Sequence, residues 1–250
     1  MRILICLLPV LLFLTPGCEE PEPEATESAG AKSAQVAQGA TAPLKERRPR
    51  AAGDSPSWGS PSAKVHIHLF TNFQCSMCAD SVEPLKRLLR AHLDDLYLVL
   101  RHNPPDKRSY AAPAAAASLA AFRQGKFWAF HDATFQEGAL TVEPLVERAV
   151  RLGMDEVRFR KDMNDPAVSA QVRNEIELAR DAGVTHKLTF VINGRVVEGW
   201  EDDGRLEDAV TLALHDADKL IDEGVPSEEV ARAAMLRGSP ISKQLAALLE

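Results

Sequence analysis

Residues 64–78 read KVHIHLFTNFQCSMC, and this stretch decides the fold. Its first seven residues, 64–70, are rich in β-branched, aromatic and aliphatic side chains and follow a turn, which predicts a β-strand. The stretch ends on Cys75 and Cys78, two cysteines separated by two residues. The sequence therefore predicts a strand that leads directly into a dithiol.

Apolar side chains recur at spacings of three and four residues after the dithiol, at Val82, Leu85, Leu88, Leu89 and Leu93. This periodicity predicts an amphipathic helix over residues 75–91. Residues 96–101, LYLVLR, form a short apolar run that is typical of a second buried strand. The opening unit is thus strand, helix, strand.

The dithiol falls where the predicted strand turns into the predicted helix. A helix N-terminus has unpaired backbone N–H groups and the positive end of the helix dipole, so it favours a thiolate on Cys75. The spacing puts Cys78 one turn further along the same face, close enough for a disulfide. Cys75 is therefore the candidate nucleophile toward a substrate disulfide, and Cys78 is the candidate that resolves the mixed disulfide.

Other uses of the pair stay open. A CxxC is half of a common zinc site, although the second CxxC or paired histidine of such sites is missing downstream. A purely structural disulfide would close a very small loop and constrain the unfolded chain only weakly. His66 and His68 share one face of the predicted strand and, with the two thiolates, are candidate copper ligands; packing in the sheet is the simpler role for them.

The N-terminus, residues 1–18, reads MRILICLLPVLLFLTPGC and predicts a secretory signal. Its ending, a small residue directly before Cys18, resembles a bacterial lipoprotein signal, in which the cysteine is lipidated and starts the mature chain. Thr15 and Pro16 depart from that pattern. We expect a signal peptide over 1–17, a lipid on Cys18, and a place in the cell envelope on the periplasmic side. Ordinary cleavage nearby and an uncleaved anchor are the alternatives.

After removal of such a signal, Cys75 and Cys78 are the cysteines left for sulfur chemistry, because Cys6 lies inside the signal. Residues 18–60 contain much Glu, Pro, Ala, Ser and Gly and few large apolar side chains, which predicts a disordered tether. The net charge of −7 gives no basic surface for nucleic acid. No interior apolar run approaches the roughly 20 residues that span a bilayer, so the N-terminal lipid is the expected membrane contact.

The chain from residue 105 to about 182 has helical character throughout, which predicts a helical insert. The expected helices are 111–124, 127–136, 142–152, 154–163 and 166–182. Asn193 and Gly194 lie between two apolar runs and predict a β-hairpin. A long helix over 206–222 follows, and one or two further helices are expected within the C-terminal residues 225–250.

Several segments together resemble the DsbA-like branch of the thioredoxin superfamily, bacterial thiol-disulfide oxidoreductases with a helical domain inserted into a thioredoxin fold. The resemblance covers residues 59 to about 223. It rests on SPSAKV at 60–65, FQCSMC at 73–78, GKFW at 125–128, and GV at 183–184 running into TFVING at 189–194. The resemblance implies a sheet with helices on both faces, redox-active Cys75 and Cys78, and protein thiols or disulfides as substrates.

Three positions depart from the family pattern. In the family a proline with a cis peptide bond precedes the Thr-Phe strand, whereas Leu188, after Lys187, stands there; a cis bond before another residue costs about 2.5–4 kcal/mol, so we expect a trans bond. Leu69 stands where the family often has a carboxylate, a candidate proton acceptor for the buried thiol. Met77 stands where a histidine can donate a hydrogen bond to the thiolate. We therefore expect slow or narrowly specific exchange.

The predicted fold is α/β: a thioredoxin-like domain over 61–224 with an inserted helical domain and a C-terminal helical extension. The predicted protein is an envelope thiol-disulfide oxidoreductase, with Ser76, Met77, Lys187 and Leu188 as candidate substrate-binding residues. No cofactor or metal is expected, and a membrane redox partner has to recycle the dithiol. The direction of electron flow stays open because it depends on relative reduction potentials. The alternative is a copper or zinc handler, or a redox-inert binding module.

Overall fold

The computed structural model describes residues 54–104 and 110–247. The predictions for the signal peptide, for Cys18 and for the tether up to residue 53 lie outside the described residues. Within the described ranges, no helix is both long enough and apolar enough to cross a membrane.

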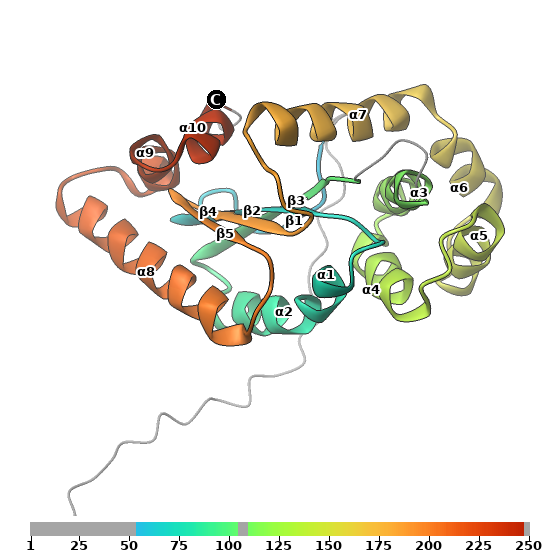
Figure 1. The fold of residues 1–250 in the computed structure, drawn as a ribbon, viewed down its shortest axis with the longest axis horizontal. Helices are drawn as coiled ribbons and strands as arrows, with labels where there is room; N and C mark the ends of the chain where they lie inside the picture. The colour runs from blue at the N-terminus through green and yellow to red at the C-terminus, as the bar shows by residue number, and fades with distance from the viewer. Residues whose placement is uncertain (1–53, 105–109, 248–250) are drawn as a thin grey trace, which may run out of the picture. The chain divides into compact units, whose positions relative to one another are not determined.

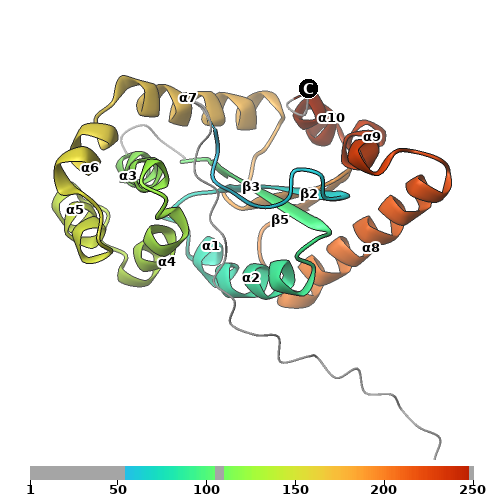
Figure 2. The same cartoon turned by 180° about the vertical axis from the view of Figure 1, so that it is seen from behind.

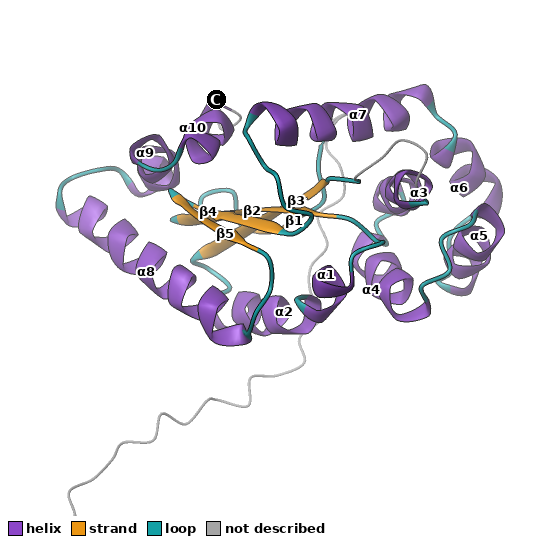
Figure 3. Cartoon of the chain, in the orientation of Figure 1, coloured by secondary structure: helices purple, strands orange, loops and turns teal. Residues whose placement is uncertain are grey.

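A five-stranded sheet lies at the centre of the described residues (Figure 3). Its strands are β1 (Ser57–Gly59), β2 (Val65–Thr71), β3 (Leu96–His102), β4 (Thr189–Ile192) and β5 (Arg195–Glu198). The order across the sheet is β1-β3-β2-β4-β5, with β2 parallel to β3 and the other neighbouring pairs antiparallel. β2 is the middle strand and is buried over its whole length, so the segment that follows it starts from a fixed position.

The predicted unit of strand, helix and strand is confirmed by the parallel pairing of β2 with β3. Its helical part is divided into α1 (Ser76–Asp80) and α2 (Val82–Ala91), whereas the sequence predicts one continuous helix. Pro84 explains the division, because it has no N–H to donate to the carbonyl of Asp80. Ser81 separates the two helices and donates its hydroxyl to the carbonyl of Cys78 at 2.9 Å. The dithiol therefore lies on a short helix directly after the central strand.

One face of the sheet is covered by α2 and α8 (Asp203–Asp222), with α1 at its end (Figure 1). Val65, Ile67 and Leu69 of β2 point to this face and belong to the same core as the apolar residues of α2 and α8. Because side chains alternate along a strand, the residues between them point to the opposite face.

The opposite face is covered by α7 (Pro166–Asp181), α9 (Val230–Arg237) and α10 (Pro240–Ala246), as the two views in Figures 1 and 2 show. A 3₁₀ turn, η1 (Ser227–Glu229), leads into α9. Phe70 of β2 packs there with residues of α7, α9 and α10. The C-terminal segment is thus helical, as predicted, and it packs on its own domain.

Among the described residues between β3 and β4, five consecutive helices form the predicted insert. They are α3 (Ala111–Arg123), α4 (Phe127–Glu137), α5 (Val142–Arg151), α6 (Glu156–Met163) and α7. The first four have a core of their own, which includes Phe130, Leu145 and Phe159. Phe73, two residues before Cys75, also belongs to this core. The insert is therefore anchored to the segment that carries the dithiol.

β1 differs from the prediction, which extended the tether to residue 60. Trp58 of β1 pairs with Leu98 of β3 and is 5% exposed. Further upstream, Ser55 donates its hydroxyl to Glu175 of α7 at 2.8 Å. Three residues are too few to show an alternating pattern, so the strand is recognisable only from its pairing with β3.

The predicted hairpin of β4 and β5 is confirmed. Asn193 adopts a left-handed conformation (φ 47°) at its turn, accepts the N–H of His66 at 2.9 Å and donates to the carbonyl of Lys64 at 3.0 Å. Gly194 lies against Gly238, between α9 and α10, so closely that a Cβ on Gly238 would lie 2.2 Å from the Cα of Gly194. The C-terminal helices thus depend on a glycine pair at the end of the hairpin.

Candidate functional site

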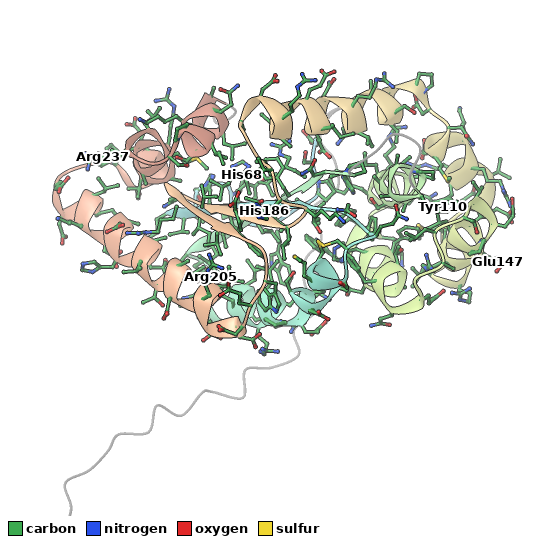
Figure 4. All side chains as sticks on the ribbon, in the orientation of Figure 1. His68, Tyr110, Glu147, His186, Arg205 and Arg237 are labelled. Carbon is green, nitrogen blue, oxygen red and sulfur yellow. A yellow bond between two sulfur atoms is a disulfide. The ribbon has the colours of Figure 1, made fainter. Side chains whose placement is uncertain are left out.

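Cys75 and Cys78 form a disulfide at the start of α1, where Figure 4 shows the yellow bond. Their Cα atoms are 5.2 Å apart. Cys75 is the N-cap residue of α1, and its Sγ accepts a hydrogen bond from the N–H of Cys78 at 3.2 Å. Because an N-cap acceptor meets the unpaired N–H groups of the first helical turn, this position favours Cys75 as the thiolate after reduction.

Only a small part of the disulfide is exposed, 5% of Cys75 and 2% of Cys78. The chain neighbours of Cys75 are exposed, Gln74 on one side and Ser76 and Met77 on the other. Cys75 is the more exposed of the two cysteines. The surface around Cys75 is thus formed largely by its own chain neighbours.

The loop before β4 faces the inner sulfur. Sγ of Cys78 lies 3.8 Å from the carbonyl oxygen of Lys187. The peptide bond before Leu188 is trans, as expected. The side chain of Leu188 is fully buried and its carbonyl accepts the N–H of Gly199 at 2.9 Å, whereas Lys187 is exposed. Of the two candidate substrate-binding residues in this loop, only Lys187 therefore has an exposed side chain.

A histidine lies in the same loop. His186, labelled in Figure 4, is exposed and its Nδ1 lies 3.1 Å from Oε1 of Glu198 on β5. This contact links the loop to the last strand of the sheet. The surface beside Lys187 thus combines a cation with an exposed histidine.

A small cavity lies beside Cys78, with about 10 Å³ of room, roughly enough for one water molecule. Lys86 of α2 lines it, together with Trp128 and His131 of α4. Leu69 of β2 also lines it, at the position where the resemblance implies a carboxylate. The cavity therefore joins the inner sulfur to residues of the insert.

Lys86, Asp132 and His131 form a chain of polar contacts at this cavity. Lys86 is buried, and its Nζ contacts Oδ2 of Asp132 and lies 3.2 Å from Oε1 of Glu83. Oδ1 of Asp132 accepts a hydrogen bond from Nδ1 of His131 at 3.1 Å. Burial acts to raise the pKa of Asp132, but hydrogen bonds from His131 and Lys86 hold that pKa below its usual value. Asp132 is therefore ionised at neutral pH.

The imidazole of His131 is 4% exposed. Its burial lowers the pKa of His131, and the contact with Asp132 only partly offsets this effect. The ring is therefore neutral at pH 7 and retains one unprotonated nitrogen. A neutral imidazole and an ammonium ion thus line the cavity beside the inner sulfur.

The sequence does not single out this chain of residues. Trp128 and His131 fall on an expected helix of the insert, where packing is the default role of such side chains. One signal is visible: Lys86 falls among Val82, Leu85 and Leu89, on the apolar side of the predicted helix, where a lysine needs an acidic partner. The partner comes from the insert, and no local pattern tells which helix the insert places there.

His66 and His68 lie on the face of β2 opposite to Leu69, and therefore away from the cavity beside Cys78. Nε2 of His66 lies 3.0 Å from the carbonyl oxygen of Pro61, and His68, labelled in Figure 4, has no hydrogen-bond partner among the described residues. Within 54–104 and 110–247, no group of three or more His, Cys, Asp or Glu lies close enough to hold a metal ion. The geometry does not bring these histidines to the dithiol, as a copper site would require.

Comparison with known proteins shows the same kind of domain. A family model described as Thioredoxin matches residues 51–211. The chain is similar to the crystal structure of a thioredoxin-like oxidoreductase from Silicibacter pomeroyi DSS-3, at 29% identity and a TM-score of 0.58, over 64% of this chain and 91% of that one.

Two more distant structures share the fold alone. The thiol-disulfide exchange protein alpha-DsbA2 from Wolbachia pipientis is 23% identical with a TM-score of 0.57, over 63% of this chain and 86% of that one. A periplasmic thioredoxin-like protein from Salmonella enterica serovar Typhimurium is 21% identical with a TM-score of 0.58, over 66% of this chain and 92% of that one.

Curated relatives are much longer proteins. The Na(+)/H(+) antiporter NhaA of Herminiimonas arsenicoxydans is 36% identical over 146 residues, which are 58% of this chain and 23% of the antiporter. The Na(+)/H(+) antiporter NhaA 1 of Salinispora arenicola is 33% identical over 158 residues, which are 62% of this chain and 24% of the antiporter. The chain thus spans about a quarter of the length of these relatives.

Proposed function

The chain belongs to the thioredoxin family, and from that membership we propose that it is a thiol-disulfide oxidoreductase that acts on protein substrates through Cys75 and Cys78. Its fold is that of the DsbA-like thiol-disulfide oxidoreductases. The observation that carries the proposal is the dithiol at the start of α1, with Sγ of Cys75 accepting the N–H of Cys78. This arrangement favours a thiolate on the outer sulfur, and the thiolate is the form that reacts in exchange.

The reaction proceeds through a disulfide between Cys75 and the substrate. In the reducing direction the Cys75 thiolate attacks a substrate disulfide, a bond forms between Cys75 and one substrate sulfur, and the other substrate sulfur leaves as a thiolate. Cys78 then loses its proton and attacks Sγ of Cys75, which forms the Cys75–Cys78 disulfide and releases the second substrate thiolate. In the oxidising direction the same steps run in reverse, and a partner of opposite redox state has to recycle the pair.

Substrate recognition is proposed for the exposed residues around the dithiol. Ser76 and Met77 follow Cys75 and are exposed, and Lys187 is exposed in the loop that faces Cys78. Leu188 is buried, so it would contribute through its backbone alone. A substrate strand that lies along this loop would place its sulfur at Cys75. The altered loop, without the cis-proline of the family, supports the expectation of slow or narrow exchange.

We propose that this exchange takes place in the cell envelope. The N-terminal signal, a lipid on Cys18 and the tether over residues 18–60 would hold the domain at a membrane on the periplasmic side. A membrane redox partner would then recycle the dithiol. One of the similar structures is of a periplasmic protein, which supports this location.

Cation antiport, the activity named for the curated relatives, is not part of the proposal, because the match spans about a quarter of those proteins. Metal handling is not favoured by any observation within the described residues, where no cluster of metal-ligating side chains occurs. The sulfur chemistry of the dithiol is therefore the function that the geometry supports best.

A trapping experiment tests the proposal. With Cys78→Ala, the mixed disulfide with a substrate protein cannot be resolved, so covalent adducts through Cys75 should accumulate under oxidising conditions. They are measured as reducible high-mass bands on non-reducing gels, and the attached proteins identify the substrates. Cys75→Ala is the matched control and should give no adduct. A complete absence of adducts with Cys78→Ala would count against exchange.

A further inference from the structure

We propose that His131 is the proton acceptor for Cys78 in disulfide exchange, with Asp132 and Lys86 as positioning residues; this assignment rests on the proposed function. His131 comes from α4 of the insert and Cys78 from α1, and both line the cavity of about 10 Å³ beside the disulfide. A cavity of that size has room for about one water molecule, which can relay a proton between groups on its walls. The insert therefore supplies a base to the thioredoxin-like part of the chain.

The resolving step requires a base at this place. Cys78 is 2% exposed, so bulk solvent does not remove its proton easily, and an apolar environment disfavours a free thiolate. The proton passes from Sγ of Cys78 to Nε2 of His131. The Cys78 thiolate then attacks Sγ of Cys75; the Cys75–Cys78 bond forms, the bond from Cys75 to the substrate breaks, and the substrate sulfur leaves as a thiolate. In the opposite direction, the imidazolium returns the proton to Cys78.

The other residues that line the cavity do not serve as the base. Leu69, Val82, Leu85, Leu89 and Leu98 contribute hydrocarbon. Trp128 and Trp58 offer indole rings, which donate through N–H and accept no proton at neutral pH. Thr71 and Ser81 are hydroxyls. Lys86 is an ammonium ion paired with Asp132 and Glu83. His131 is the group that remains.

The protonation pattern of His131 suits this role. A carboxylate only accepts hydrogen bonds, so the contact with Asp132 places the proton on Nδ1 and leaves the lone pair on Nε2. No hydrogen bond from the described residues occupies Nε2. The charged and titratable groups near the ring are Asp132 on α4, Lys86 on α2 and His102 on β3. Burial of the ring, Lys86 and His102 lower the pKa of His131, whereas Asp132 raises it. The base is thus free to accept a proton at pH 7.

Aromatic rings hold the imidazole in place. The ring centroids of four neighbours lie 4.9–5.6 Å from that of His131: Phe135, Trp128, Phe73 and Phe127. Phe73 is two residues from Cys75, so the same packing that orients the imidazole also positions the dithiol. An oriented base needs no rearrangement at the moment of proton transfer.

The test separates the two chemical steps with an aromatic disulfide, 5,5′-dithiobis(2-nitrobenzoate), mixed with the reduced full chain in which Cys6→Ser and Cys18→Ser leave Cys75 and Cys78 as the reacting thiols. Attack by Cys75 releases one coloured thiolate, and resolution by Cys78 releases a second. For His131→Gln we expect the first phase at the wild-type rate and the second phase slowed at least about tenfold at pH 7. The defect should shrink as the pH rises toward 9, where solvent hydroxide deprotonates the thiol.

Two further variants complete the design. Asp132→Asn keeps the imidazole and removes the carboxylate that orients it, so it should show a smaller defect with the same pH dependence, and it serves in place of His131→Gln if that chain does not fold. His66→Gln is the matched control, a buried histidine on the other face of β2, and both of its phases should keep the wild-type rate.

The possible outcomes are distinguishable. The assignment would be overturned if His131→Gln and Asp132→Asn both kept a second phase at the wild-type rate at every pH. An equal, pH-independent slowing of both phases would overturn it too. Loss of the first phase in the wild-type chain would instead contradict the proposed exchange itself. A defect confined to the second phase and restored at high pH supports His131 as the acceptor.

Discussion

A single backbone hydrogen bond, from the N–H of Cys78 to Sγ of Cys75, distinguishes the two cysteines. It favours the thiolate on Cys75, whereas Cys78 faces the carbonyl of Lys187 and the cavity. In the reduced chain we therefore expect Cys75 to be alkylated first, with a pH midpoint below the value of about 8.5 of an ordinary thiol. Alkylation by iodoacetamide across pH 5–10, read by fragmentation mass spectrometry that assigns the modification to Cys75 or to Cys78, measures this.

The control for that measurement is the Cys78→Ala chain, in which alkylation reports Cys75 alone. Removal of Cys78 leaves its backbone N–H in place, so the midpoint should stay low. If Cys78 were alkylated before Cys75, or if the pH midpoint for alkylation of Cys75 were that of an ordinary thiol, the role of the N-cap hydrogen bond would be contradicted.

How far the site is predictable depends on the distance along the chain between its residues. Cys75 and Cys78 follow from local spacing after a strand. Leu188 was a reasonable candidate from its place before β4, yet its side chain is fully buried, because burial depends on how the loop packs. His131 and Lys86 meet only in three dimensions, through Asp132; the sequence indicates that Lys86 needs an acidic partner but does not tell which residue supplies it.

The strand β2 makes the stability of the fold depend on pH. His66 and His68 lie on its buried face, and burial lowers the pKa of both, that of His68 to well below the usual value. Burial also lowers the pKa of His131 on α4. The unfolded chain then binds more protons than the folded chain below about pH 6.5, so the unfolding free energy falls as the pH decreases.

We therefore expect the unfolding free energy of the oxidised chain to be constant above about pH 7 and to fall between pH 6.5 and 5. Each histidine contributes a slope of about 1.4 kcal/mol per pH unit until its folded-state pKa is reached. Carboxylates whose pKa is lowered in the folded state, such as Asp132, also add to the unfolding free energy, and this addition is lost only at lower pH. Urea unfolding at a series of pH values measures the slope.

His68→Leu isolates one of these groups. Both ring nitrogens of His68 have no hydrogen-bond partner among the described residues, so the substitution removes no such bond. The slope between pH 6.5 and 5 should decrease by about 1.4 kcal/mol per pH unit, with little change in stability at pH 8. An unchanged slope would show that His68 is not the neutral buried group that its position implies.

Element boundaries were predictable where the pattern is long. The insert helices follow from helical character that continues over two or more turns, and Asp165 before Pro166 marks the start of α7; the side chain of Asp165 accepts the N–H of Ala167 there. The division between α1 and α2 at Ser81 was missed because the apolar spacing continues across it. β1 was missed because it exists through its partner β3 and has no pattern of its own.

For the whole chain, the family resemblance gives the layers but not the contacts between them. The sheet with helices on both faces follows from the resemblance, and the C-terminal helices could be foreseen as helices. Their place on the face of β2 opposite to the dithiol depends on the contact between Gly194 and Gly238, residues that are remote in sequence. The insert reaches the dithiol through Phe73 and the cavity in a similar way. The chemistry of the inner sulfur is therefore a property of the assembled domain.

The redox state should change the stability of the whole domain in an uncommon direction. A disulfide usually stabilises a fold by constraining the unfolded chain, but this one closes a very small loop and constrains it weakly. The thiolate of the reduced form gains the hydrogen bond from Cys78 only in the folded state. We therefore expect the reduced chain to unfold with a free energy at least equal to that of the oxidised chain. The difference should grow as the pH rises toward about 8.5, where the unfolded thiol also ionises.

Guanidinium unfolding of the chain with and without reductant, from pH 6 to 8.5, measures this difference. Cys78→Ala is the matched control, because it cannot form the disulfide and should unfold identically in both conditions. If the oxidised chain were more stable by about 2 kcal/mol or more, the bond would act as a structural cross-link. A more stable reduced form instead means that folding favours reduction of the pair, which makes the oxidised domain a donor of disulfides to partners with a lower reduction potential.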